Sequence, residues 1–311
     1  MGAKITRRLS EVEVVIAGLT EDKFLPLDKF TKDDLLEIKG WCDSHEPKNG
    51  SIYVALGKIY ESMMPSENSK EKAIECFSAG ASMENPLAMY FLGMFYWTYN
   101  YPLDAALYWF EQGAKLFDIN STMMVGIIHM KEGDKKKAIG WLLRSANMGS
   151  PTGMSWLASL YSEERDEKQA IYWYTLSANL GERKAMNNLG YIYMGLAEKK
   201  LDVAYEWFLK AAKLGSGSAY WNLAMLEGQR GKNQSNSKII EYLSLSYNLS
   251  NDEDKKKCFD VLARFVPWGT VSSTIQSFCR SKIPDVSPAY SKKPERSHDQ
   301  LTYEKFSDEQ N

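Results

Sequence analysis

The feature that most constrains the fold of this chain is an internal repeat. A small residue opens each of six similar phrases, and the phrases follow one another at intervals of 32 to 35 residues. A second small residue, eight positions later, keeps the same intervals in the first five phrases. Repeats of this length predict a solenoid, because one short unit cannot bury its own apolar face without a stacked neighbour. The opening residues are Ala73, Ala106, Ala138, Ala170, Ala204 and, less faithfully, Ile239.

Each phrase has the spacing of an amphipathic helix. In "AIYWYTLSA", Ala170, Trp173, Tyr174, Ser177 and Ala178 fall at i, i+3, i+4, i+7 and i+8, which is one helical stripe. An aromatic side chain buries about 150–250 Å², an area that only stacked neighbours can cover. The stripe therefore predicts core residues rather than a ligand site. The tryptophans assigned to the core on this argument are Trp109, Trp141, Trp173 and Trp207.

A second phrase precedes each of the first, and its landmark is a Leu-Gly or Leu-Ala step, as in "NNLGYIYM" from Asn187. Glycine costs a helix about 1 kcal/mol relative to alanine, so its recurrence predicts that a neighbouring helix backbone approaches closely at this point. Each repeat is thus predicted to contain a first helix with the small residue and a second helix with the aromatic stripe. Gly149, Gly181 and Gly215 are predicted to cap the ends of second helices.

The alternation of "A..NLG..Y" with "A..WY..AA..G" resembles the Sel-one-like repeat family, which is related to tetratricopeptide repeats. The clearest copies are "AMNNLGYIYMG" with "AYEWFLKAAKLGS", and "GMSWLASLYSEERDEKQAIYWYTLSANLGE". The resemblance covers residues 50–250, although the family's longer loop between helices is mostly absent and the sixth copy is degraded. It implies an all-α fold, a right-handed α-α superhelix of about six two-helix repeats with helical caps. It also implies a protein-binding scaffold without catalytic residues.

The flanks depart from the repeat. Residues 1–49 are predicted to form an N-terminal helical cap, because Ser10 with Glu13 and Thr31 with Asp34 resemble capping boxes before helices near 10–18 and 31–44. A strand over residues 12–18 is the alternative. Residues 251–280 are predicted to form C-terminal capping helices. Residues 281–311 are predicted to be a disordered tail, with docking of that tail in the groove as the alternative.

Composition and motifs exclude several classes of function. A net charge of −2 supplies no basic stripe for nucleic acid. HExxH, P-loop, GxSxG and CxxC motifs are absent from the sequence, so no enzyme activity, cofactor or metal is expected. No run approaches the roughly 20 apolar residues of a membrane span, which predicts a cytoplasmic protein. The start "MGAKIT" fits the pattern for acylation of Gly2, and this possibility stays open.

The first helices offer a candidate binding surface. In the fifth repeat Ala185 and Leu189 point inward, which places Asn187, Asn188 and Tyr191 on the opposite face. The superhelix implied by the resemblance would make this face concave. Its aromatic and methionine residues are typical of interfaces, and its asparagines are expected to be exposed, whereas packing against the next repeat is the alternative for the apolar members. The predicted partner-binding residues are Tyr90, Phe91, Met94, Met123, Ile127, Ser155, Trp156, Asn187, Asn188, Tyr191, Trp221, Asn222 and Met225.

These observations predict a protein or peptide as the partner. The first hypothesis is a scaffold or adaptor that holds the partner in the groove. The alternative is an inhibitor, such as an immunity protein that blocks a bacterial toxin. The aromatic, nearly uncharged surface favours a peptide or an apolar ligand, because an inhibitor is expected to show a stronger charge bias.

Overall fold

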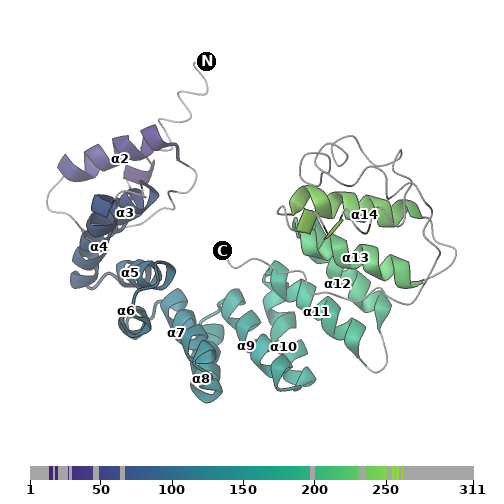
Figure 1. Cartoon of the computed structure of the whole chain (residues 1–311). Helices are drawn as coiled ribbons and strands as arrows, with labels where there is room; N and C mark the ends of the chain where they lie inside the picture. Colours follow the sequence, from purple (N-terminus) through teal and green to yellow (C-terminus); the bar gives the residue numbers. More distant parts are fainter. Residues whose placement is uncertain are drawn as a thin grey trace. The chain divides into compact units, whose positions relative to one another are not determined.

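The fold is seen in a computed structural model (Figure 1). It describes residues 14–16, 18–19, 27, 30–44, 49–63, 67–196, 200–230, 236–250, 254–255, 257–258 and 261. All regular secondary structure within these ranges is α-helical, and successive helices pack in pairs. The predicted class, an all-α chain of about six two-helix repeats, is confirmed.

The chain divides into two compact units, residues 1–157 and 158–311. Helix α9, Pro151–Glu163, contributes residues to both. Helix α2 of unit 1 contacts α3, and the pairs α3/α4, α5/α6 and α7/α8 form the first three repeats. The other helices of unit 1 are α2 (Lys32–Ser44), α3 (Gly50–Ser62), α4 (Glu67–Ser82), α5 (Pro86–Thr98), α6 (Leu103–Lys115), α7 (Ile119–Lys131) and α8 (Lys135–Asn147).

Unit 2 continues the same scheme. The pairs α11/α12 and α13/α14 form the last two repeats, and α10 packs on α11 (Figure 1). Its other helices are α10 (Glu167–Asn179), α11 (Arg183–Gly195), α12 (Leu201–Lys213), α13 (Gly217–Arg230) and α14 (Asn236–Leu249). Odd-numbered helices from α3 onward are therefore the first helices of the repeats, and even-numbered helices from α4 onward are the second.

The small residue of the first helix receives a large side chain of the second. A Cβ atom added to Gly190 would lie 2.4 Å from the ring of Phe208, and one added to Gly57 would lie 2.4 Å from the ring of Phe77. The predicted close approach is confirmed, but an aromatic ring occupies the space rather than a helix backbone. Glycine is selected here because a methyl group would overlap that ring.

The core residue of each aromatic pair is the one that follows the tryptophan. Phe110, Tyr174 and Phe208 are buried, and Leu142 takes the same place in the third repeat. Trp109, Trp173 and Trp207 pack against the buried core, as predicted, although they and Trp141 are themselves only partly buried. Lysine ammonium groups lie over the faces of such rings, as when Lys210 Nζ lies 4.0 Å from the ring centroid of Trp207.

Glycines end three of the second helices as predicted. Gly149, Gly181 and Gly215 have φ values of 89°, 90° and 83°, the left-handed conformation that glycine adopts without strain. The corresponding position in the first two repeats holds Glu84 and Phe117, at φ values of 57° and 61°. These two repeats therefore keep the left-handed turn although neither has a glycine at this position.

Helix α2 lies where the sequence predicts a helix near residues 31–44. The Thr31 backbone N–H donates to Asp34 Oδ2 over 2.8 Å, which is half of the predicted capping box before α2. Residues 14–16 and 18–19 are helical, so the strand alternative is wrong there. The capping box at Ser10, most of residues 251–280 and the tail 281–311 lie outside the described residues, as does Gly2.

Candidate functional site

The predicted surface is apolar in unit 1. Tyr90, Phe91 and Met94 on α5 are partly buried, and so is Met123 on α7, whereas Ile127 is 7% exposed. Phe91 stacks on Phe77 of the first repeat, with ring centroids 5.9 Å apart. Its ring thus joins two repeats and still keeps part of its surface in solvent.

Two lysines accompany these rings. Lys58 Nζ on α3 lies 5.1 Å from the ring centroid of Phe91, and Lys131 Nζ on α7 lies 4.1 Å from that of Trp97 on α5. Both distances fall within the range of a cation–π contact. The sequence reasoning missed Lys58, Trp97 and Lys131. Lys58 occupies the place in the first repeat that Met94 holds in the second, so extending the same offsets to the first repeat would have included it.

On α9, Ser155 is buried and Trp156 is partly exposed. Ser159, one turn further along, contacts the hydroxyl of Tyr174 on α10 with an oxygen–oxygen distance of 2.7 Å. Asn188 Nδ2 on α11 donates to the same hydroxyl over 3.0 Å. Burial raises the pKa of Tyr174, and the two hydrogen bonds lower it in part. The hydroxyl therefore links the fourth repeat to the fifth.

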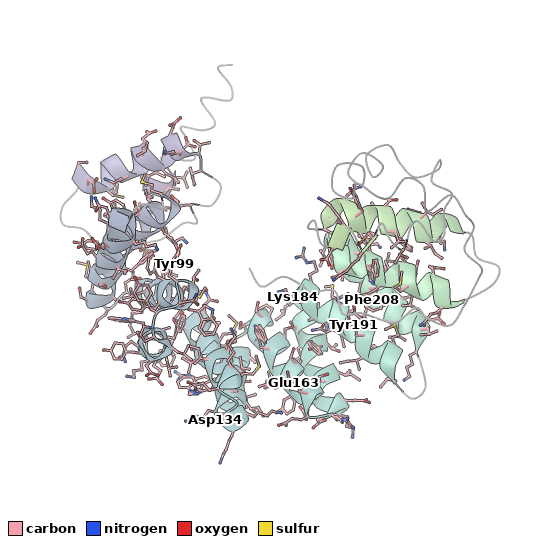
Figure 2. All side chains as sticks on the ribbon, viewed as in Figure 1. Tyr99, Asp134, Glu163, Lys184, Tyr191 and Phe208 are labelled. Atoms are coloured by element: carbon pink, nitrogen blue, oxygen red, sulfur yellow. The ribbon has the colours of Figure 1, made fainter. Side chains whose placement is uncertain are left out.

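A second polar network links the fifth repeat to the sixth. Asn222 Nδ2 on α13 donates to Asn187 Oδ1 on α11 over 2.9 Å, and the Tyr191 hydroxyl donates to Asn222 Oδ1 over 2.8 Å. Tyr191 in turn packs edge-on against Phe208 of α12, with ring centroids 5.5 Å apart (Figure 2). The amide of Asn222 thus uses both its donor and its acceptor within unit 2.

Burial separates the asparagines into two kinds. Asn187 and Asn222 are 3% and 2% exposed, so the expectation that they face solvent was wrong. The physical reason is that each finds an amide or hydroxyl partner on the neighbouring repeat, which satisfies its polar atoms in the interior. Trp221 and Met225 of α13 are buried as well. Asn188 and Tyr191 remain partly exposed.

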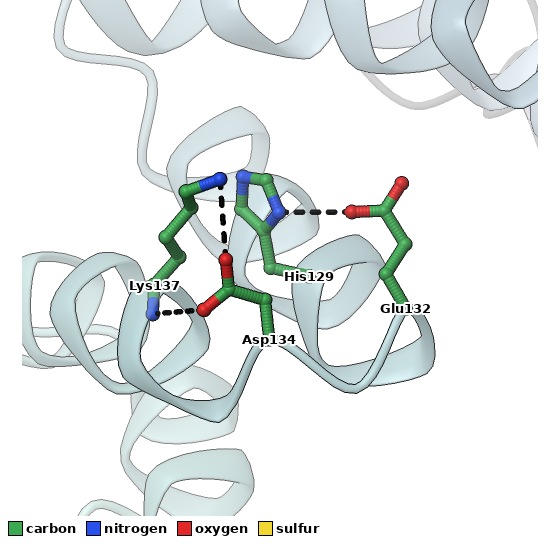
Figure 3. A network of polar contacts seen from close by, with 4 residues as sticks. All are labelled: His129, Glu132, Asp134 and Lys137. Atoms are coloured by element: carbon green, nitrogen blue, oxygen red, sulfur yellow. Dashed lines mark hydrogen bonds and ion pairs between the residues drawn. The ribbon is translucent and has the colours of Figure 1, made fainter.

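His129 belongs to a turn rather than to a reaction site. Its Nδ1 lies 3.0 Å from Glu132 Oε2, and its backbone oxygen accepts from the Asp134 N–H over 2.9 Å (Figure 3). Asp134 caps α8 by accepting from the Lys137 backbone N–H over 3.1 Å, and this hydrogen bond, with the Lys137 ammonium, lowers the pKa of Asp134. All four side chains are accounted for by the turn between α7 and α8.

The described residues contain little that would support catalysis. No group of three or more His, Cys, Asp or Glu side chains in them is arranged to hold a metal ion. Cys42 and Cys258 are buried free thiols, and burial raises the pKa of Cys258 to about 12, which keeps that thiol protonated. No helix among those described has the length and apolarity needed to cross a bilayer.

The match to a family of known proteins covers the second part of the chain. The Sel1 repeat matches four times, at residues 124–150, 151–182, 183–216 and 217–251. The last three matches begin at the first residues of α9, α11 and α13. The first two repeats, α3 to α6, lie outside these matches, and they are the ones that replace the capping glycine.

Solved structures share the fold. A Sel1 repeat protein from Oxalobacter formigenes is 18% identical with a TM-score of 0.58, and the alignment covers 71% of this chain and 100% of that one. The protective antigen c5321 of uropathogenic Escherichia coli, which has an SLR fold, is 25% identical with a TM-score of 0.56, over 69% of this chain and 49% of that one. Yeast Tom70 is 15% identical with a TM-score of 0.59, over 80% and 51%. A comparison with curated protein sequences finds no match.

Proposed function

We propose that this chain, in which residues 124–251 match four Sel1 repeats, is a non-enzymatic, cytoplasmic scaffold that binds a protein or peptide. The partner would lie on the side chains of the first helices. Repeats of this kind are suited to the task because stacking them creates an extended surface without a separate active site.

One observation carries the proposal. The first helices of unit 1 keep aromatic and methionine side chains partly in solvent at Phe91, Met94 and Trp156. A first helix that served only the core would place polar residues at these positions, since partly exposed apolar side chains stabilise little in the free protein. Exposed aromatic and methionine side chains are enriched at protein interfaces.

In unit 2 the same surface divides between two roles. Asn187 and Asn222 hold adjacent repeats together, and Trp221 with Met225 lies in the interior. We assign the partner contact in this unit to Asn188 and Tyr191, which are partly exposed. This leaves unit 1 with the larger share of apolar contact surface among the described residues.

Site-specific photocrosslinking tests the proposal. A photoreactive phenylalanine analogue at Met94 is expected to capture the partner in cells, whereas the same analogue at Tyr108 is not. Both positions lie in the second repeat, but Tyr108 is an exposed residue on the second helix α6. Capture through Tyr108 and not through Met94 would place the interface on the opposite helices and refute the assignment.

The activity of the captured partner in the complex distinguishes a scaffold from an inhibitor. A partner that keeps its own activity in the complex supports a scaffold. A partner whose toxin or enzyme activity disappears on binding would identify the chain as an inhibitor, the alternative that the sequence left open.

A further inference from the structure

The first helices of unit 1 carry a lysine–aromatic row, which consists of Lys58, Phe91, Trp97 and Lys131. Each lysine ammonium lies over a ring of α5, Lys58 over Phe91 and Lys131 over Trp97. Helix α5 contacts both α3 and α7, so the two lysines come from the helices on either side of it. The row therefore has an aromatic centre and a cation at each end.

The two cations differ in their other contacts. Lys58 Nζ pairs with Glu61 Oε2 on its own helix over 2.6 Å. Lys131 is exposed, and no carboxylate within the described part of the chain forms an ion pair with it. An ammonium held over a ring keeps N–H donors that point away from the ring, so it can still bind an anion.

We propose that the lysine–aromatic row binds an extended acidic segment of the partner, with apolar side chains over Phe91 and Met94 and carboxylates at Lys58 and Lys131. This inference rests on the proposed scaffold function and specifies its ligand. Charge complementarity is the argument: Lys131 is a cation that no carboxylate of the described residues pairs with, and Lys58 adds a second ammonium that it shares with Glu61, so a segment with matching carboxylates is selected over neutral or basic ones.

The arrangement of the helices sets the spacing of the acidic residues. Neighbouring helix axes lie about 8–10 Å apart, so the axes of α3 and α7 are at most about 20 Å apart, and the two ammonium groups are closer because both lie over rings of α5. An extended chain advances about 3.3 Å per residue, so carboxylates up to about six residues apart would reach both lysines. The residues between them would carry the apolar side chains that cover Phe91 and Met94.

A synthetic peptide tests the inference on the full chain. The probe is a fluorescein-labelled peptide of about twelve residues with two aspartates about six residues apart and leucines between them. Fluorescence anisotropy is expected to show binding that weakens as salt rises, because the paired charges are exposed. A peptide with lysines in place of both aspartates should bind at least about tenfold more weakly.

Matched variants locate the binding. Lys131→Met keeps an alkyl chain beside Trp97 but removes the charge, and it should weaken binding about five-fold, whereas Lys131→Arg should restore it. Lys136→Met is the control, since Lys136 is an exposed lysine on α8 outside the row. Thermal unfolding of each variant confirms that folding is unaffected.

Several outcomes would overturn the inference. Equal binding of the acidic and basic peptides, equal effects of the two methionine variants, or absence of peptide binding would each do so. Preferential binding of a single-stranded oligonucleotide would replace the acidic peptide with nucleic acid. If crosslinking through Met94 persists while the acidic peptide does not bind, only the acidic-segment inference is refuted. If crosslinking through Met94 is also lost, the scaffold proposal is refuted as well.

Discussion

At the scale of the residue, the fold depends on pairs in which one member must be small. Gly190 faces the ring of Phe208, and Gly93 faces that of Phe110. In the fourth repeat Ala158 holds this position and belongs to the same buried cluster as Tyr174. The size of one side chain thus sets how closely the two helices of a repeat approach.

Replacing Gly190 with alanine is expected to destabilise the protein by about 1–3 kcal/mol, because the added methyl group overlaps the Phe208 ring. Urea denaturation followed by circular dichroism measures the change. Gly195→Ala is the control, since a Cβ there meets nothing within 4 Å. Equal effects of the two substitutions would show that helix propensity, and not the ring, determines the outcome.

Substitutions at the left-handed turn position are expected to change stability in opposite directions, depending on the residue that is there now. Gly181→Ala should destabilise the protein by about 1 kcal/mol, because alanine is strained at a φ of 90°. Glu84→Gly should stabilise it by up to about 1 kcal/mol, because Glu84 already bears that strain. Thermal unfolding of both variants provides the comparison, and a loss of stability in Glu84→Gly would contradict the strain argument.

At the scale of the element, adjacent first helices are joined by buried side-chain hydrogen bonds. Asn187 and Asn222 connect α11 to α13, and the Tyr174 hydroxyl connects α10 to both α9 and α11. A buried polar group costs little when it is paired and about 1–3 kcal/mol when its partner is removed. These bonds therefore favour one register between neighbouring helices.

Asn222→Ala is expected to lower the free energy of unfolding by about 1–3 kcal/mol, since it removes the buried hydrogen bonds of this amide to the Asn187 carbonyl and the Tyr191 hydroxyl. A double-mutant cycle with Asn187→Ala should show coupling, because both substitutions remove the same hydrogen bond. Unchanged stability with reduced partner binding would instead return Asn222 to the binding surface.

The buried Tyr174 hydroxyl predicts a pH dependence. Burial raises its pKa above the ordinary value of about 10, so the folded state retains the proton that the unfolded chain releases. Stability from this effect is present below about pH 10 and is lost as pH rises from there through the folded-state pKa. The urea concentration at the unfolding midpoint should fall less steeply with rising pH, measured on both sides of pH 10, for Tyr174→Phe than for the wild type.

The sequence predicted the elements better than it predicted their surfaces. Spacing alone located the helix pairs and the capping glycines, because helical period and left-handed turns act through neighbours in the chain. It did not distinguish Asn187 from Asn188, one buried and one partly exposed. That difference depends on which residue meets Asn222 from the next repeat, and no local pattern encodes this contact.

The lysines of the row were missed for a related reason. From the sequence, Lys131 is expected to be a solvated charge at the end of a helix. Its cation–π contact depends on the position of Trp97 on the preceding first helix. On α5, Tyr90 and Phe91 were found because aromatic residues are unusual on an exposed helix face, whereas Trp97 was missed. A cation on a neighbouring repeat has no such signature.

At the scale of the whole molecule, the repeats within each compact unit contact mainly their neighbours along the chain. Stability in such an array is a sum of local units and the interfaces between them, so disturbances should remain local. The two compact units, residues 1–157 and 158–311, extend the same expectation to larger segments. This sets the array apart from a single globular core, where a cavity or clash weakens every element.

Hydrogen exchange tests this expectation with two matched variants. Gly93→Ala should reduce amide protection mainly in α5 and α6, and Gly190→Ala mainly in α11 and α12, because each added methyl group meets an aromatic ring of its own repeat. Mass spectrometry of exchanged peptides resolves these segments. Uniform loss of protection across the chain in either variant would show that the array unfolds as one cooperative body.

The hydrogen bond between Asn187 and Asn222 also limits how freely the repeats can be exchanged. Helix spacing and the left-handed turn would let a designer or a gene duplication move one repeat beside another, because those features recur in the first five copies. An amide that matches one neighbour does not recur. A transplanted fifth repeat would bring a buried Asn187 to a surface without the complementary amide, so the fifth and sixth repeats are inherited together or must change together.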